Sequence, residues 1–270
     1  MVKFKSSLKW LFIGLVLLFI YAPILLLTVY SFNAGNSIRE WVGFSLEHYQ
    51  YFFNPHNEPF QIVLQTVLLA IIVATLSTIL GTIGAIGIFY SKKRTGAALS
   101  GINQIPVINA EVVTAISFAL LVTILGLNDG ESYLPLVLGQ MMLCTPFVVL
   151  SVIPKLKQMD NNLYEAALDL GATPTKALFS AIIPQIIPGI ISGFLLAITL
   201  SLDDYIIAAY TKPETFKTIS THIYGLTKGK QVETIKASYW AFTAIVFLLI
   251  IVLVTVLNVV ATKKQKENNK

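Results

Sequence analysis

Residues 160–184 read DNNLYEAALDLGATPTKALFSAIIP, a polar stretch between long apolar runs, and local rules resolve it into two short helices. Asn162 is a good residue to cap the first helix. Gly171 follows the last apolar residue of that helix, where a left-handed backbone conformation favours a residue without Cβ. Thr173 is placed to cap a second helix with a proline in its first position, and Pro184 is expected to end the unit. The stretch therefore predicts a helix–glycine–helix corner, which we call the elbow.

Each helix of the elbow carries an apolar stripe. In the first helix the stripe has the spacing i, i+3, i+4 and i+7, and its members are Leu163, Ala166, Ala167 and Leu170. Glu165 and Asp169 share the opposite face as like charges, and Glu165 also completes a variant of the capping box with Asn162. In the second helix the stripe consists of Ala177, Leu178, Ala181 and Ile182. A compact corner of this kind, flanked by hydrophobic runs, indicates a docking element.

The elbow resembles the EAA motif of the permease subunits of ATP-binding-cassette (ABC) importers. The matching residues are Glu165, Ala166, Ala167, Gly171, Ile183 and Pro184. Ala181 and Ile183 depart from the residues usual in that family, but both remain apolar. The resemblance implies a type I ABC importer permease fold, in which an ATPase on a separate chain grips the elbow and moves the membrane helices.

The composition is that of a protein that crosses a membrane several times. Of the 270 residues, 55% are hydrophobic and only 12% are charged, whereas soluble proteins average about 25% charged residues. Apolar runs of ~20 residues, the length that a bilayer requires, predict six transmembrane helices. They lie at residues 10–31, 61–90, 98–126, 133–154, 185–210 and 237–261. We therefore expect an all-α polytopic membrane protein, with a six-helix domain at 10–261 between an N-terminal segment 1–9 and a basic tail 262–270.

Lys and Arg residues indicate the orientation of the spans, because they are more frequent in cytoplasmic segments. With a cytoplasmic N-terminus, thirteen of the nineteen basic residues fall in inner segments and six in outer ones. This distribution predicts that both termini and the elbow are cytoplasmic, in a plasma or inner membrane. It also accounts for the net charge of +5 without a nucleic-acid partner. The first apolar run is longer than the ~7–15 residues of a signal-peptide core, so it is expected to be retained as a span.

Three carboxylates lie inside predicted spans: Glu111, Asp203 and Asp204. A charge in the middle of a bilayer costs ~2.5–3.5 kcal/mol on insertion scales, so such residues usually face an aqueous path or a polar partner. At 1.5 Å of rise per residue, Asp203 lies ~27 Å from the start of its span, near the outer mouth, and Glu111 lies ~20 Å from the start of its own. Adjacent helical residues point about 100° apart, so one of the two aspartates is expected to line a path while the other caps, packs or pairs. Two interpretations stay open: a route for cations, or structural carboxylates that are interfacial or paired with lysines.

The acidic segments resemble those of spermidine/putrescine (PotC-type) permeases. Residues 201–205, Ser-Leu-Asp-Asp-Tyr, resemble a Ser-Leu-Asp-Asp-aromatic run in the fifth span of that family, and Glu111 begins a segment similar to its acidic third span. The segment Gly43–Tyr49 is also similar, and the aromatic residues around it fit either an interfacial belt or a contact surface for an extracellular partner. The resemblance implies a polyamine substrate and a substrate path that comprises Glu111, Asp203, Asp204 and Tyr205. It further implies two ATPase subunits, a sister permease in a heterodimer, an extracellular or periplasmic solute-binding protein, and membrane lipid as partners.

Catalytic motifs are not found in the sequence. It has no Walker A loop, no His-Glu-x-x-His and no Gly-x-Ser-x-Gly, and its three histidines lack metal-ligand spacing. We therefore expect a non-catalytic chain without cofactor, metal or nucleic acid. The resemblance implies that it is a permease, which imports polyamines by alternating access driven by partner ATPases. Two alternatives remain: an ABC permease for another solute, such as a metal chelate or an anion, and an ion-coupled carrier that uses Glu111 and Asp203 as proton relays.

Overall fold

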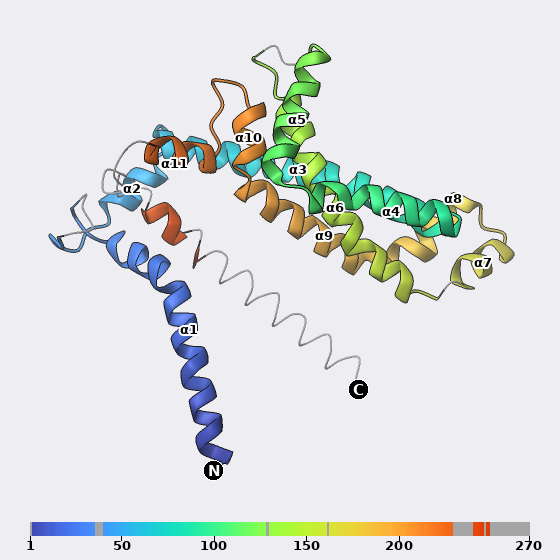
Figure 1. Cartoon of the computed structure of the whole chain (residues 1–270), viewed down its shortest axis with the longest axis horizontal. Helices are drawn as coiled ribbons and strands as arrows, with labels where there is room; N and C mark the ends of the chain where they lie inside the picture. Colours follow the sequence, from blue (N-terminus) through green and yellow to red (C-terminus); the bar gives the residue numbers. More distant parts are fainter. Residues whose placement is uncertain are drawn as a thin grey trace. The chain divides into compact units, whose positions relative to one another are not determined.

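Helices make up the fold in the computed structural model (Figure 1). It describes residues 2–35, 40–127, 130–160, 162–228, 240–245 and 247–248, and this part of the chain contains no β-strand. In a bilayer every backbone N–H and C=O must find a partner within the protein, which favours helices. The chain divides by contact into two compact units, a first unit of residues 1–61 and 226–270 and a second unit of residues 62–225.

The first unit contains α1 (Val2–Tyr30) and α2 (Glu47–Phe53). The chain that leaves α1 is fastened to α2, because Ser31 Oγ lies 2.7 Å from the Tyr49 hydroxyl. None of the most apolar part of α1, residues 12–30, is buried inside the described structure, so this helix presents its apolar side chains outward. The aromatic segment thus contains a short helix, α2, in which Phe52 is buried.

The second unit holds most of the remaining helices. Its elements are most of α3 (Glu58–Tyr90), then α4 (Lys93–Ile108), α5 (Glu111–Ile124), α6 (Leu134–Gln158), α7 (Asn162–Asp169), α8 (Pro174–Ala177), a π-helical segment (Leu178–Ile182), α9 (Ile183–Asp203), α10 (Ile206–Thr211) and most of α11 (Ile219–Thr227). Helices α6 and α9 pack along each other, and their fully buried side chains, such as Val148 and Ile186, form the centre of the core. Because lipid is as apolar as these side chains, close van der Waals packing stabilises this pair.

Four of the six predicted spans are confirmed as helices long and apolar enough to cross a membrane. They are Phe12–Tyr30, Glu58–Tyr90, Leu134–Gln158 and Pro174–Asp203. Of the sixth predicted span, 237–261, only the helical residues 240–245 and 247–248 are described. The rest of that span and the predicted tail 262–270 lie outside the described residues.

The third predicted span, 98–126, is wrong as a single helix. The chain forms α4 and α5 there, and their axes bend by 104° at a short break. Pro106 lies near the end of α4, where it removes a backbone donor. Asn109 then adopts an extended conformation, and its side-chain amide donates to Thr114 Oγ1 at 3.1 Å. Hydropathy does not detect the bend because both halves are apolar.

The fifth predicted span, 185–210, is wrong at its start. The helix already begins at Pro174, so Pro184 does not end the elbow as expected. Directly before this proline the chain is π-helical, and the Ile183 N–H donates to the Leu178 carbonyl five residues back. A wider turn of this kind accommodates a proline ring and its missing N–H, which lets the helix continue.

The same span is also wrong at its end. Helix α9 stops at Asp203, and α10 begins separately at Ile206. The cause is the side chain of Asp204, which bonds to backbone N–H groups of α10 and so starts a new helix.

A close contact sets the spacing between α3 and α6. A Cβ at Gly81 would lie 2.7 Å from side-chain carbons of the fully buried Val148. We therefore expect Gly81→Ala to destabilise the protein by ~1–3 kcal/mol, the usual cost of overpacking, measured as a lower melting temperature in detergent. Gly87→Ala is the matched control, because it has the same gain in helix propensity but no atom within 4 Å of the new Cβ. Equal melting temperatures for the two variants would contradict the prediction.

Candidate functional site

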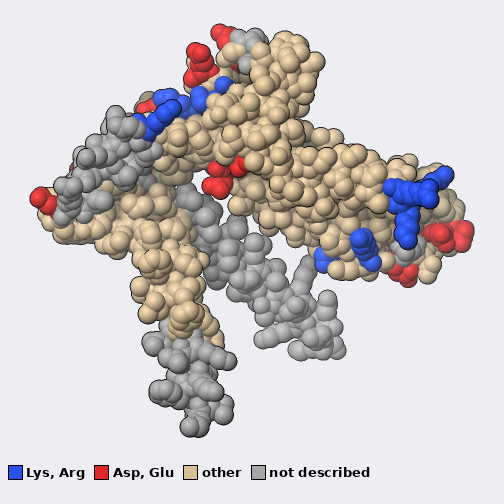
Figure 2. Space-filling view, viewed as in Figure 1, with Lys and Arg blue, Asp and Glu red and all other residues tan. Residues whose placement is uncertain are grey.

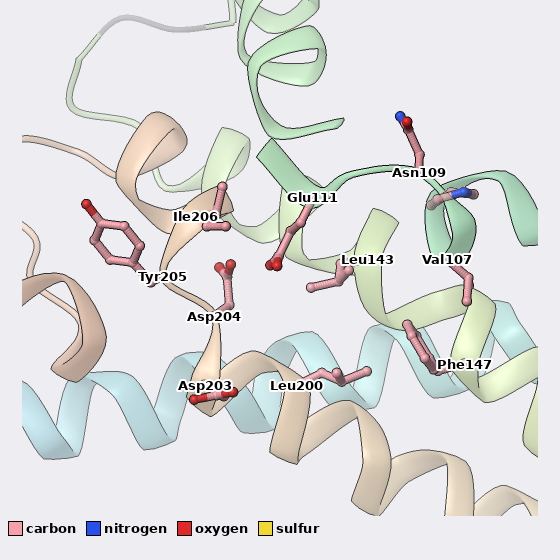
Figure 3. Close-up of a pocket in the computed structure, with 11 residues that line it drawn as sticks. Val107, Asn109, Glu111, Leu143, Phe147, Leu200, Asp203, Asp204, Tyr205 and Ile206 are labelled. Atoms are coloured by element: carbon pink, nitrogen blue, oxygen red, sulfur yellow. The ribbon is translucent and has the colours of Figure 1, made fainter. Parts of the chain in front are cut away.

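A pocket of about 560 Å³ opens beside the two helix breaks of the second unit (Figure 3). Its walls come from the α4–α5 break, from α6 and from the α9–α10 break. The lining residues are Pro106, Val107, Asn109, Glu111, Leu143, Phe147, Leu200, Asp203, Asp204, Tyr205 and Ile206. Irregular backbone within a membrane protein is tolerated where it lines a cavity or is buried in protein. Two breaks beside one pocket therefore mark it as the candidate site.

All four residues of the predicted substrate path line this pocket. Glu111 lies in the first turn of α5 and is half-buried, whereas Asp203 is the exposed last residue of α9. Figure 3 shows the side chains of Glu111 and Asp204 pointing toward the same space from opposite walls. Neither Lys nor Arg is among the described residues that line the pocket, which makes it acidic.

Asp204 has a structural role in this arrangement. The residue is only 4% exposed, its Oδ1 accepts from the Ile207 N–H at 3.0 Å, and its Oδ2 accepts from the Ala208 N–H at 3.0 Å. These bonds satisfy N–H groups that the start of α10 would otherwise leave without partners. Of the two adjacent aspartates, Asp204 is thus the one that caps the start of α10, whereas Asp203 is exposed and also lines the pocket.

Gln140 of α6 belongs to the same network, although hydropathy does not reveal it. Its side chain is fully buried, its Nε2 donates to Asp204 Oδ2 at 2.9 Å, and its Oε1 accepts from the Ser201 hydroxyl at 2.7 Å. A polar group in a membrane span needs a partner, so an amide within the apolar run 133–154 is a usable signal in the sequence.

Tyr205 lines the pocket at the α9–α10 break, and its ring is turned away from the space between Glu111 and Asp204 (Figure 3). Its ring centroid lies 4.2 Å from that of Tyr224 on α11. The start of α11 is held at the end of α9, because Ser220 Oγ donates to the backbone carbonyls of Leu202 at 3.3 Å and Asp203 at 3.4 Å. Ammonium groups are attracted to carboxylates, so the acidic residues of this pocket suit an organic cation.

The elbow forms the predicted corner at Gly171. The φ angle there is +84°, in the left-handed region that favours glycine. The Gly171 N–H donates to the Leu168 carbonyl at 2.8 Å, and the Ala172 N–H donates to the Ala167 carbonyl at 3.1 Å. This is the bonding pattern of a Schellman C-terminus, which fixes the direction in which the chain leaves α7.

The two predicted caps of the elbow have different outcomes. Thr173 is confirmed as the cap of α8, since its hydroxyl accepts from the Lys176 N–H at 3.4 Å. Asn162 is not a cap: it is the first residue of α7, and its N–H donates to Asp160 Oδ1 at 3.0 Å. The Asp160 carboxylate thus satisfies one backbone donor in the first turn of α7.

The apolar stripe predicted for α7 is not buried within this chain. Leu170 is 90% exposed, and Leu163 and Ala166 are exposed as well. Helix α7 instead faces its own unit with Tyr164, which packs against the core. Glu165 also lies on the open side. The elbow thus presents both apolar and acidic residues to its surroundings.

A single helix joins the elbow to the pocket. The stretch Pro174–Asp203 is continuous over 30 residues, with the elbow at one end and Asp203 at the other. At 1.5 Å of rise per residue it is ~45 Å long. A rigid-body displacement of the elbow would therefore displace one wall of the pocket.

The chain matches a known protein family over most of its length. Residues 77–266 match the binding-protein-dependent transport system inner membrane component family. The chain belongs to this family. The permease is 30% identical over 217 residues to the spermidine/putrescine transport system permease protein PotC of Haemophilus influenzae, which covers 80% of this chain and 83% of that protein.

Two relatives in Escherichia coli K12 are also similar to the permease. The spermidine/putrescine transport system permease protein PotC is 28% identical over 250 residues, or 93% of this chain and 92% of that protein. The putrescine transport system permease protein PotI is 35% identical over 197 residues, or 71% of this chain and 70% of that protein.

Family membership confirms the predicted class of protein. The permease is a non-catalytic, multi-pass membrane subunit of an ABC importer, and ATP hydrolysis belongs to a separate partner subunit. A solute-binding protein and a sister permease are partners that such a system implies. The membership disfavours the alternative of a self-contained ion-coupled carrier.

Proposed function

We propose that the permease imports a polyamine, spermidine or putrescine, through the acidic pocket. The observation that carries this proposal is a pocket lined by Glu111 and Asp203 without a Lys or Arg among its described residues. A polyamine carries several ammonium groups along a flexible chain, so spaced carboxylates suit it. The names of the relatives in Haemophilus influenzae and Escherichia coli, which are permeases for spermidine or putrescine, support this choice.

The proposed assembly pairs this permease with a sister permease in a heterodimer and with two ATPase subunits, one of which grips the elbow. A solute-binding protein delivers the polyamine from outside, and lipid surrounds the apolar faces. ATP binding and hydrolysis bias the elbow between two rigid-body positions, and α9 carries that movement to the pocket, which opens alternately to each side.

The proposed orientation has both termini and the elbow in the cytoplasm, with segments 1–9 and 262–270 flanking the membrane domain 10–261. Basic side chains support it, because they gather at the elbow end of the second unit (Figure 2). They are Lys92, Lys93, Arg94, Lys155, Lys157 and Lys176.

Labelling from one side of the membrane tests this orientation. Thr175 is exposed in the elbow, and Glu214 is exposed in the loop between α10 and α11. In a Cys144→Ala background, we expect a membrane-impermeant maleimide added to intact cells to label Glu214→Cys but not Thr175→Cys. Permeabilised cells should show labelling of both. Labelling of Thr175→Cys in intact cells would refute the proposed orientation and the proposed ATPase contact.

Transport by the assembled complex tests the proposed function. The permease is reconstituted with its partners in proteoliposomes. It should take up radiolabelled spermidine when ATP is supplied on the side of the membrane where the ATPase subunits lie, and unlabelled putrescine should compete for this uptake. Uptake should continue when the proton gradient is collapsed, because ATP is the energy source. A complex that hydrolyses ATP but takes up no di- or triamine would reject the polyamine and leave another solute as the substrate.

A further inference from the structure

Two adjacent residues of α6, Gly139 and Gln140, contact the residues around the α9–α10 break. A Cβ at Gly139 would lie 2.7 Å from Ile207 Cγ2, so the absence of a side chain there lets α10 lie against α6. The next residue, Gln140, bonds on both sides of the break, to Ser201 in α9 and to Asp204 beyond its end. One amide group thus ties α6 to the end of one helix and to the start of the next.

The direction of these hydrogen bonds is fixed by chemistry. A carboxylate accepts hydrogen bonds and does not donate, so the Gln140 amide must turn Nε2 toward Asp204 and Oε1 toward the Ser201 hydroxyl. The three residues are 0%, 4% and 2% exposed, respectively, so solvent does not replace a lost partner. The network is therefore satisfied in one arrangement.

Ser201 differs from the other hydroxyl residues of its helix. Ser192 and Thr199 donate to carbonyls of α9 itself, four residues back, at 2.8 and 2.9 Å. Ser201 instead turns its hydroxyl to Gln140 on a different helix. Since the local bond is the default for Ser in a helix, this departure indicates a contact between helices that the fold specifically makes.

We propose that Gln140 is a positioning residue for transport, which holds the α9–α10 break on α6 and so keeps Asp203 in place relative to Glu111. Gln140 is not among the residues that line the pocket, so it acts through Asp204 and not on the substrate. The proposal rests on the proposed function of the pocket. When α9 carries the displacement of the elbow, the amide link makes the pocket wall move as one piece. Without this link the backbone at the α9–α10 break moves independently of α6. ATP is then hydrolysed without transport of a corresponding amount of substrate.

The test measures spermidine uptake and ATP hydrolysis together in the reconstituted complex. Gln140→Leu keeps the size of the side chain but removes both polar atoms, and we expect it to lower uptake per ATP at least about fivefold, the lower range of an allosteric coupling. Stimulation of the ATPase by the loaded solute-binding protein should persist. A residue with only a structural role would lower uptake and hydrolysis in proportion and would leave their ratio unchanged.

A matched pair of serines extends the test. Ser201→Ala removes the donor to Gln140 with a small change in volume, and it should lower uptake per ATP in the same direction. Ser192→Ala, which removes an exposed hydroxyl bonded only to its own helix, should leave the ratio unchanged. This pair keeps the proposal testable if Gln140→Leu does not assemble.

A double substitution at Gln140 and Asp204 tests whether uptake per ATP can be restored. Gln140→Glu sets a second carboxylate against Asp204 and should lower uptake per ATP more than Gln140→Leu. Combined with Asp204→Asn, the new amide can donate to the new carboxylate while its oxygen still accepts from Ile207. The double variant should therefore recover part of the ratio that Gln140→Glu loses, but not all of it, because the Ala208 N–H loses its acceptor.

The outcomes separate the two proposals. Wild-type uptake per ATP in both Gln140→Leu and Ser201→Ala would overturn the positioning role, as would a double variant no better than Gln140→Glu alone. A wild-type complex that takes up no polyamine would overturn the substrate instead. The ratio would then be measured with the solute that the complex does transport.

Discussion

Gly171→Val is expected to abolish ATP-driven uptake while the permease still reaches the membrane in normal amounts. The backbone at Gly171 has φ of +84°, a conformation that costs other L-residues ~1–2 kcal/mol and a β-branched residue more. A Cβ at this position meets no atom within 4 Å, so backbone strain and not crowding is the cause. Relief of that strain breaks the Schellman bonds to Leu168 and Ala167 and turns α7 away from α8. An ATPase that grips the elbow would then no longer move α9.

A series of substitutions at Gly171 distinguishes the effect of backbone strain from a general effect of replacing the glycine. Asn tolerates left-handed backbone better than Ala, and Ala better than Val, so uptake should fall in the order Gly, Asn, Ala, Val. Gly87→Val, in the last turn of α3 with no atom within 4 Å of the added Cβ, controls for a β-branched residue at a helical glycine. Uptake and membrane abundance are measured for each variant. Normal uptake by Gly171→Val at normal abundance would show that the elbow does not couple the permease to its ATPase.

The corner of the elbow could be predicted from the sequence because its signals are local. The positive φ of Gly171 and the cap by Thr173 depend on residues within a few positions along the chain. The face of α7 that packs against the core through Tyr164 could not be predicted in the same way. An apolar stripe indicates a helix face that is stabilised by burial, but it does not show whether the covering surface belongs to the same chain. In this chain Leu170 remains exposed.

Hydropathy does not predict the two helix breaks that line the pocket. The chain at Asn109 and at Asp204 is flanked on both sides by apolar helix, so a sliding average runs through both breaks. The role of each aspartate also depends on tertiary contacts. Helical geometry predicts that Asp203 and Asp204 diverge, but only the position of Gln140 on another helix decides which of them is buried.

Glu111→Gln and Asp203→Asn are expected to lower polyamine uptake without loss of folded complex, whereas Asp204→Asn is expected to lower stability. Glu111 and Asp203 line the pocket, and a charge-assisted bond to an ammonium group is worth ~1.5–3 kcal/mol, so each loss should reduce uptake roughly 10- to 150-fold. Asp204 accepts three hydrogen bonds, from Gln140, Ile207 and Ala208. An amide in its place has a single acceptor oxygen, which leaves buried donors unsatisfied at ~1–3 kcal/mol.

Two measurements distinguish these roles: spermidine uptake per assembled complex and the melting temperature of the purified complex in detergent. Glu214→Gln, an exposed carboxylate outside the pocket, serves as the neutral control for removal of one negative charge. Loss of uptake by Asp203→Asn at an unchanged melting temperature fits a carboxylate that meets the substrate, since an exposed residue has little effect on folding. If Asp204→Asn gave that same pattern, the buried aspartate would be the one that meets the cation, and the division of roles between the two neighbours would be reversed. If neither Glu111→Gln nor Asp203→Asn changed uptake, the pocket would not be the route of a cation, because its two open carboxylates would make no contribution to transport.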